Sequence, residues 1–158
     1  MRRKDREVTD FSEIIAIMER CDVCRLALNG DGYPYILPLN FGLLVKNGIV
    51  ELYFHGAMEG TKYGLMERDN RASFEMDCSH RLVMDRQRGS CTMEYESVIG
   101  QGRVEMIPDG EKYDALRILM ARYHQEAFPF NQDMVPRTKV FKLVVESMTG
   151  KIRMKRND

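Results

Sequence analysis

Hydrophobic and polar positions follow a helical spacing at the start of the chain and then change to strand-like alternation. Asp10-Phe-Ser-Glu13 resembles a capping box, with an N-cap oxygen and an acid three residues later. The apolar residues after it share one helical face up to about Arg20. From Val23 the pattern (VCRLAL) is that of a strand. We therefore predict an N-terminal arm and helix over residues 1–22, followed by β-structure.

Tight turns divide the next stretch into strands. Asn29-Gly-Asp-Gly32 and Lys46-Asn-Gly48 contain residues that tolerate positive φ, which hairpin turns require. They predict a second strand from Tyr33 to Val45 and a third from Ile49 to Phe54. Pro34 and Pro38 lack a ladder donor, so the second strand is expected to be irregular or at a sheet edge near them.

The middle of the chain alternates between breaks and strands. The segment from His55 to Lys62 breaks the strand run and leads into a short helix to about Asp69. Residues 71–77 (RASFEMD) alternate like a strand. Residues 78–91 are polar, and we predict a mobile loop with some extended structure there.

The remaining residues predict a long strand, a helix and a closing strand. Residues 91–107 form a β stretch in which Gly100 and Gly102 indicate a bend or bulge. A helix is predicted over 108–125, and a closing strand region over 139–155. Within that region the strand proper is expected to span Val140–Glu146, with Gly150 and Lys151 beyond its turn.

The order of these elements defines a fold class. Strands and helices do not alternate strictly, which disfavours a doubly wound parallel sheet. Consecutive strands joined by tight turns favour a mainly β antiparallel barrel with flanking helices. No repeat or linker is visible in the 158 residues, so we expect a single domain over 1–158.

Composition excludes several partners. The 24 Lys and Arg residues balance the 24 Asp and Glu residues, and zero net charge argues against nucleic acid as a partner. No apolar run approaches the ~20 residues of a membrane span. The charged N-terminus has no apolar stretch of the kind that secretory signals carry, so a cytoplasmic protein is expected.

The cysteines allow two interpretations. A zinc site could combine Cys21, Cys24, Cys78 and His80, because the spacings CxxC and CxH resemble ligand pairs. The alternative, which we favour, is four reduced and mostly packed thiols with no metal.

A glycine-rich turn between the third strand and the short helix is a candidate phosphate site. Gly56 and Gly60 bring backbone N–H groups together, Thr61 adds a hydroxyl group and Lys62 adds a cation. Helix N-termini favour anions through unpaired N–H groups and the macrodipole. The turn matches neither the P-loop nor the dinucleotide fingerprint, and such turns also occur without a ligand.

The stretch Leu37-Pro-Leu-Asn-Phe41 is a second candidate. A proline in a strand leaves neighbouring backbone groups free to meet the donor and acceptor edge of a flat heteroaromatic ring. An ordinary edge strand explains the same residues.

Together these segments resemble the pyridoxamine-phosphate-oxidase-like flavoproteins, and within them the Nim-type nitroimidazole-resistance branch. The resemblance spans nearly the whole chain and rests on an ordered set of segments: Cys24-Arg-Leu-Ala-Leu, Asp31-Gly-Tyr-Pro-Tyr-Ile-Leu-Pro-Leu-Asn-Phe-Gly42, Tyr53-Phe-His-Gly-Ala-Met-Glu-Gly-Thr-Lys62, Asn70, Phe74-Glu-Met-Asp77, Tyr95-Glu-Ser-Val98 and Thr149-Gly-Lys151.

The resemblance implies a six-stranded Greek-key split β-barrel that forms a homodimer, with FMN in two clefts at the dimer interface. Pro38, Leu39 and Asn40 match the strand whose backbone lines the isoalloxazine ring in family members. His55, Thr61 and Lys62 match the segment that meets the phosphate and ribityl chain, and Ser97 matches a position often close to the phosphate. Phe54 is also implied as a cofactor-binding residue. Other members carry Arg or Lys immediately after the glycine, whereas this chain has Thr61 and then Lys62. The residues that bind pyridoxamine phosphate are not recognisable, so vitamin B6 oxidation is not expected.

The implied function is an FMN-dependent oxidoreductase that reduces nitro or other small aromatic compounds. His55 would donate a proton or position the substrate, or instead make a structural hydrogen bond. Phe128 and Phe130 would form a lid over the ring or pack in the core or dimer. The alternatives are a flavin- or haem-binding module without turnover, with His55 or His124 as haem ligand, and a dimer with a vestigial cleft.

Overall fold

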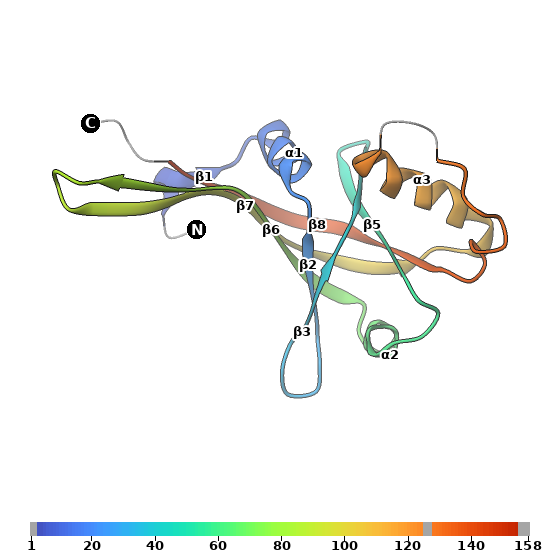
Figure 1. Cartoon of the computed structure of the whole chain (residues 1–158). Helices are drawn as coiled ribbons and strands as arrows, with labels where there is room; N and C mark the ends of the chain where they lie inside the picture. Colours follow the sequence, from blue (N-terminus) through green and yellow to red (C-terminus); the bar gives the residue numbers. More distant parts are fainter. Residues whose placement is uncertain (1–2, 125–127, 155–158) are drawn as a thin grey trace.

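One antiparallel sheet organises the computed structural model, which describes residues 3–124 and 128–154 (Figure 1). Its path is β3–β2–β6–β7–β8–β5–β4, and β1 pairs with the far end of β8. The described strands are β1 (Glu7–Val8), β2 (Cys24–Leu28), β3 (Tyr35–Leu39), β4 (Gly42–Lys46), β5 (Ile49–Gly56), β6 (Arg71–Asp85), β7 (Ser90–Met106) and β8 (Lys139–Arg153). The predicted mainly β, antiparallel split-barrel class is confirmed, with eight strands in place of the six expected.

Three helices flank this sheet within the described residues: α1 (Phe11–Arg20), α2 (Thr61–Arg68) and α3 (Lys112–Tyr123). The Asp10 side chain accepts a hydrogen bond from the Glu13 amide at 2.9 Å, which confirms the predicted N-cap of α1. The predicted helix over 108–125 begins with a single 3₁₀ turn, Asp109–Glu111, and continues as α3; residue 125 lies outside the described part of the chain.

The predicted single strand from Tyr33 to Val45 is wrong. It forms two strands, β3 and β4, which lie at opposite ends of the sheet path. The chain crosses between them at Asn40 and Phe41, and Gly42 then packs on α3 so closely that a Cβ atom there would lie 2.7 Å from the Leu119 backbone nitrogen. Because β3 is an end strand, Pro38 does lie at a sheet edge, as predicted.

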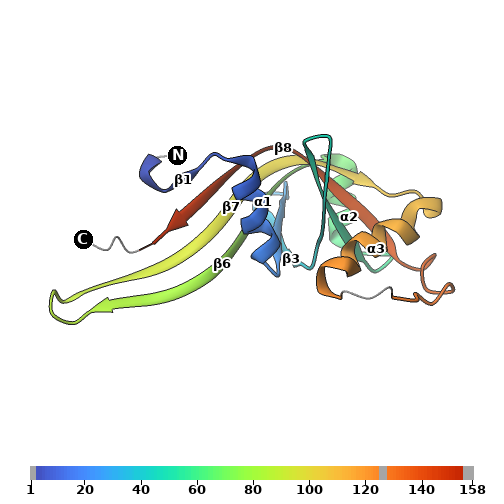
Figure 2. The same cartoon turned by 90° about the horizontal axis from the view of Figure 1, so that it is seen from above.

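The predicted mobile loop over 78–91 is also wrong. β6 continues to Asp85 and β7 begins at Ser90, so these residues form the outer part of a long hairpin. Figures 1 and 2 show this hairpin extending well beyond the rest of the molecule. Leu82, Met84 and Met93 share one face of it, and the many polar residues of the segment conceal this alternation.

The closing strand is longer than predicted. β8 passes Glu146 without a turn and runs beside β7 to Arg153, so Gly150 and Lys151 lie within the strand; residue 155 is outside the described part. The register shift between Gln101 and Gly102 confirms the predicted irregularity in β7.

Two apolar clusters result from this arrangement. The main core lies between the sheet and α1, with Ile17, Met18 and Phe74 almost fully buried. A smaller cluster under α3 includes Tyr53 and Val140. Side chains of β5 alternate between the two, so Phe54 enters the main core while Tyr53 faces α3. This alternation also directs His55, the next residue, towards the α3 side.

Candidate functional site

Two lysines meet at one aromatic ring where β5, α2 and β8 converge. The Nζ atom of Lys62 lies 4.5 Å from the centre of the Tyr63 ring, and that of Lys139 lies 4.3 Å from it. Lys139 reaches this position because it pairs with Gly56 at the start of β8. The Tyr63 hydroxyl donates to the Ala57 carbonyl oxygen at 2.7 Å, and burial raises the pKa of Tyr63. The ring is therefore a fixed, neutral platform beside two ammonium groups.

Two glycines lie beside these lysines where β5 leads into α2. Gly60 precedes α2 with φ of 150°, and no side chain caps the N-terminus of the helix. A Cβ atom on Gly56 would lie 2.8 Å from the Tyr63 hydroxyl oxygen and 3.0 Å from Lys62 Nζ, so glycine lets these two side chains pack directly against the end of β5. The uncapped amides of α2 and the two nearby cations favour an anion such as phosphate at this helix N-terminus.

His55 lies one residue before Gly56, near the end of β5. Its side chain is exposed and lines a cavity of about 210 Å³ between α3 and residues 130–138. Desolvation by the cavity walls, and then the nearby Lys62 charge, lower the pKa of His55 below its ordinary value. The imidazole is consequently neutral at pH 7, with one nitrogen able to donate and the other able to accept.

The cavity beside His55 is suited to one small apolar ring. Its volume exceeds the roughly 150 Å³ of an engineered cavity that binds benzene, and it is below the ~300 Å³ at which sites for drug-sized ligands begin. Asn131 and Thr138 are polar groups in its lining. The other lining residues are apolar: Leu116, Leu119, Met120, Phe130, Met134 and Val135.

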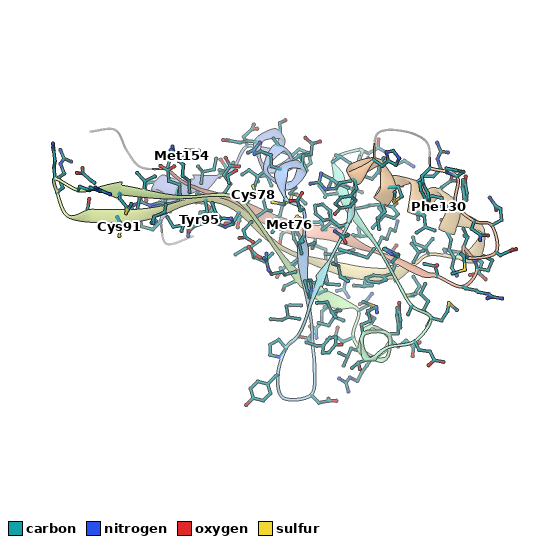
Figure 3. The ribbon with its side chains drawn as sticks, viewed as in Figure 1. Met76, Cys78, Cys91, Tyr95, Phe130 and Met154 are labelled. Atoms are coloured by element: carbon teal, nitrogen blue, oxygen red, sulfur yellow. The ribbon has the colours of Figure 1, made fainter. Side chains whose placement is uncertain are left out.

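The phenylalanines proposed as a lid take different positions. Phe130 lines the cavity and meets Tyr113 edge-on at 5.7 Å, so it also packs against α3 (Figure 3). Phe128 contacts Phe130 at 5.1 Å and remains exposed. His124, the alternative haem ligand, follows the last residue of α3 and lies 6.4 Å from the Phe128 ring.

The strand end at Pro38, Leu39 and Asn40 approaches the same end of the barrel. Gly42 of β4 pairs with Tyr53 of β5. Asn40 precedes Gly42 by two residues and His55 follows Tyr53 by two residues. Because the two strands are antiparallel, Asn40 and His55 lie beyond the same end of the paired segment. Asn40 is exposed, and its side-chain amide donates to the Asp22 carbonyl oxygen at 3.4 Å.

Two of the cofactor residues implied by the resemblance lie away from this group. The Phe54 ring is fully buried and stacks on Phe141 at 5.3 Å, so only its backbone borders the site. Ser97 pairs with Lys151, whereas His55 pairs with Val140. At ~3.3 Å per residue, these positions are about 35 Å apart along β8. One protomer therefore brings His55, Thr61 and Lys62 together but not Ser97.

The cysteines are free thiols. Cys21 and Cys24 are buried, Cys78 is partly buried and Cys91 is exposed. Burial raises the pKa of both Cys21 and Cys24, which disfavours their thiolates. In residues 3–124 and 128–154, no group of three or more His, Cys, Asp or Glu side chains is placed to hold a metal ion, so the structure does not assemble the zinc alternative.

Lys139 and the cavity were not found from the sequence. Lys139 immediately precedes the predicted last strand, and only the β5–β8 register brings it to Gly56. The apolar spacing of α3 indicated a buried face, but it gave no sign that this face leaves a cavity. Within the described residues, no helix is long and apolar enough to cross a bilayer.

The fold is therefore a split antiparallel barrel, and its candidate site combines two lysines at the Tyr63 ring with an apolar cavity lined by His55. The chain belongs to the pyridoxamine 5'-phosphate oxidase family, whose sequence model matches residues 10–152. No protein with a curated description matches the sequence.

Solved structures agree with this assignment. A candidate 5-nitroimidazole antibiotic resistance protein from Bacteroides thetaiotaomicron is 32% identical, with a TM-score of 0.80; the match covers 92% of this chain and 86% of that one. The flavocytochrome Anf3 from Azotobacter vinelandii is 20% identical at a TM-score of 0.79, covering 100% and 75%. A FAD and haem binding protein from Mycobacterium smegmatis is 20% identical at a TM-score of 0.81, covering 97% and 76%. The last two support the fold.

Proposed function

We propose that this protein is a cytoplasmic FMN-dependent oxidoreductase that reduces nitroaromatic or other small aromatic compounds, in the manner of the Nim-type proteins. The observation that carries the proposal is that a cationic pair and an apolar cavity occur at the same end of β5. Lys62 and Lys139 would attract an anion there, and His55 lines a cavity sized for one ring. The likeness to the Bacteroides thetaiotaomicron protein supports the nitroaromatic class.

The residues present fit FMN. Glycine at position 56 lets Lys62 pack against the end of β5, and Lys62 and Lys139 give this turn the positive charge that a phosphate dianion requires. Lys62, Lys139 and the amide of Thr61 would hold the phosphate. The strand end at Pro38, Leu39 and Asn40 would border the ring. FMN supplies the electron transfer when bound.

The protein's own groups would prepare the substrate. The apolar walls of the cavity would exclude water and orient a neutral ring. Neutral His55 would hold a proton at one imidazole nitrogen, available to an oxygen of the substrate. The alternative role of His55 is a structural hydrogen bond to the phosphate or backbone, and the two roles differ in their effect on turnover.

The proposal includes a homodimer that shares its two cofactor clefts. The family resemblance gives Ser97 a place close to the phosphate. In one protomer, however, the residues of β8 that pair with Ser97 and with His55 are about 35 Å apart along the strand. A cleft that uses both Lys62 and Ser97 therefore requires two copies of the chain.

The first test is the cofactor itself. We expect the purified protein to be yellow, or to quench FMN fluorescence on titration, and to consume a 5-nitroimidazole when a reductant is supplied. His55→Gln should lower turnover and leave FMN affinity nearly unchanged if His55 delivers a proton. A colourless protein that binds no FMN contradicts the proposal, while FMN binding without turnover of any nitro or aromatic compound leaves the binding-module alternative.

A mixing experiment tests the shared cleft. Lys62→Ala and Ser97→Ala homodimers each lack an intact site, but a mixed dimer has one site with neither substitution. After exchange of subunits, about one quarter of all sites should therefore recover wild-type FMN affinity. No recovery contradicts a cleft built from Lys62 of one protomer and Ser97 of the other.

Haem is the alternative cofactor, and two of the structural neighbours are a flavocytochrome and a haem binding protein. A Soret band on haem titration that is lost in His55→Ala or His124→Ala would favour this alternative and name the ligand.

A further inference from the structure

Two cysteine thiols meet at the end of α1. Cys21 follows the last residue of this helix and is fully buried, whereas Cys78 of β6 is only partly buried. Both thiols donate to the Ile17 carbonyl oxygen, which lies 3.3 Å from Cys21 Sγ and 3.9 Å from Cys78 Sγ. Burial first, and then the interaction with Cys78, raise the pKa of Cys21. The two sulfur atoms are therefore neighbours, although the residues are distant in the sequence.

Charged and polar groups surround the Cys78 sulfur. Glu96 is the residue of β7 that pairs with Cys78, and its carboxylate accepts from Cys78 Sγ at 3.6 Å. The Ser79 hydroxyl donates to the same sulfur at 3.6 Å. Arg20 donates to Glu96 at 2.6 Å and also interacts with Cys78. Cys78 thus has an acceptor for its proton and two donors that can hydrogen-bond an oxygen atom added to its sulfur.

Cys78 is open to small solutes, and Cys21 is not. Cys78 lines a pocket of about 380 Å³ together with Arg20, Ser79 and His80. Figure 3 places Cys78 where the β6–β7 hairpin leaves the body of the molecule. Cys21 is not among the residues that line this pocket. A small polar molecule in the pocket therefore reaches the Cys78 sulfur first.

We propose that Cys78 is a site of oxidation by small hydroperoxides, and that this oxidation ends in a reversible disulfide bond between Cys78 and Cys21. The class of oxidant follows from the pocket. Its lining carries both arginines and aspartates, so it suits a small, neutral, polar molecule, and a hydroperoxide is one that a cysteine sulfur attacks. The proposal rests on the thiols of this chain and does not depend on FMN.

The oxidation takes place in two steps. In the first, Glu96 accepts the Cys78 proton and the sulfur attacks the hydroperoxide, so an S–O bond forms and the O–O bond breaks. The proton passes from Glu96 to the departing oxygen, which leaves as an alcohol or as water. In the second, Cys21 attacks the oxidised sulfur, so the S–S bond forms, the S–O bond breaks, and hydroxide leaves with the Cys21 proton as water. The two thiols lose two electrons, and the hydroperoxide gains them.

Burial gives the two thiols different roles. Cys78 meets the hydroperoxide, while the buried Cys21 keeps its proton until an oxidised sulfur is beside it. Formation of the disulfide stops the oxidation before the sulfinic acid, which thiols do not reverse. A dithiol then restores both cysteines by thiol–disulfide exchange.

The test treats the reduced full chain with hydrogen peroxide and then digests it with trypsin without reduction. Cleavage after arginine separates residues 21–25 from residues 72–81. We expect these two peptides to be joined, with two hydrogen atoms fewer than the separate peptides, and to part again on addition of dithiothreitol. Cys24→Ser should give the same joined pair, which assigns the bond to Cys21. Cys91→Ser should also give it, which excludes a role for the exposed thiol of the hairpin.

The same digest contains the results that overturn the proposal. One is a peptide 21–25 that loses two hydrogen atoms by itself, because it then holds a disulfide between Cys21 and Cys24. The other is a Cys78 that stays reduced at a peroxide concentration that oxidises the exposed Cys91. These measurements follow the thiols alone, so they can succeed or fail independently of the FMN titration.

Variants test the role of each group. Cys21→Ser should leave Cys78 as a sulfenic acid that dimedone traps. Glu96→Gln should slow the oxidation of Cys78 at least about tenfold, because the acceptor for its proton is lost. Glu94→Gln is the matched control: it also removes a buried carboxylate paired with an arginine at 2.6 Å, and it should leave the rate unchanged. Equal rates in the two glutamine variants overturn the role of Glu96. Should Glu96→Gln fail to fold, Ser79→Ala at an exposed position takes its place and should also slow the oxidation.

Discussion

Lys62 holds its ammonium group 4.5 Å from the centre of the Tyr63 ring, on a platform that Lys139 approaches at 4.3 Å. The negative face of the aromatic ring attracts each cation, while the two cations repel each other. An anion bound beside both lysines would reduce that repulsion and add charge-assisted contacts. We therefore expect the site to prefer a dianion.

Loss of Lys62 should weaken FMN binding. We expect Lys62→Ala to lower the affinity by one to two orders of magnitude, on the order of 1.5–3 kcal/mol for a charge-assisted contact to phosphate. Lys139→Ala should have a similar effect, measured by quenching of flavin fluorescence. Lys46→Ala, in the exposed β4–β5 hairpin, is the matched control and should change nothing. Unchanged affinity in both site variants would place the phosphate elsewhere.

His55 should titrate below its ordinary pKa of about 6.5, because cavity walls desolvate the ring and Lys62 repels its charged form. NMR titration of the imidazole measures this directly. Lys62→Ala should raise the pKa of His55 part of the way back, since it removes the repulsion and leaves the desolvation. A His55 pKa that does not respond to Lys62→Ala would show that the two groups do not interact.

The same shift gives a pH dependence of stability. Between the lowered folded pKa of His55 and its unfolded pKa, the unfolded chain binds more protons, so this group makes stability rise with pH. Below that pH window, His55 lowers the free energy of unfolding, and well above the window it has no effect on it. His55→Gln should therefore be more stable, relative to wild type, at about pH 5 than at about pH 8. Urea unfolding at both pH values checks this, and an equal difference at the two contradicts it.

Two glycines provide opposite tests of packing. A Cβ atom on Gly42 would lie 2.7 Å from Leu119 backbone atoms, so Gly42→Ala should push α3 outward and destabilise the fold by about 1–3 kcal/mol. Gly64 lies within α2 with open space where a Cβ atom would lie, and Gly64→Ala should stabilise by roughly 0.5–1 kcal/mol. Thermal melting of the two variants should move in opposite directions, and a tolerated Gly42→Ala would contradict the close approach of α3.

The sequence predicted a helix or turn correctly where the residues of that one segment were sufficient to specify it. Asp10 and the apolar positions after it define α1, and Asn47 and Gly48 have the positive φ values that their hairpin turn requires. These features depend on neighbouring residues, which the sequence displays directly.

Features that depend on pairing between distant segments were missed. Leu82 and Met84 lie two residues apart in a mostly polar segment, and the face that they share can be identified only from their pairing with Met93 and Cys91. Lys139 reaches the candidate site through the register of β8 with β5, which no local pattern encodes. Ser97 matches the family pattern, but its distance from His55 along β8 could not be known before the fold was in place.

Arg122 provides the last prediction, because it connects α3 to the rest of the fold. Its guanidinium lies 4.6 Å from the centre of the Phe41 ring and donates to the carbonyl oxygens of Met18, Glu19 and Cys21 at the end of α1. A cation at a helix C-terminus is favourable, and hydrogen bonds to charged groups contribute more than neutral ones.

We expect Arg122→Ala to destabilise the protein by about 2–4 kcal/mol, because it removes the charged donor from these carbonyls and uncovers Phe41. Since α3 also forms one wall of the cavity beside His55, the variant should bind aromatic ligands more weakly even where it remains folded. Urea unfolding and ligand titration measure the two effects. Arg117→Ala, on the exposed side of the same helix with Asp114 at 4.0 Å, is the control and should stay within about 0.5 kcal/mol of wild type. Equal stability of the two variants would show that Arg122 does not hold α3 in place.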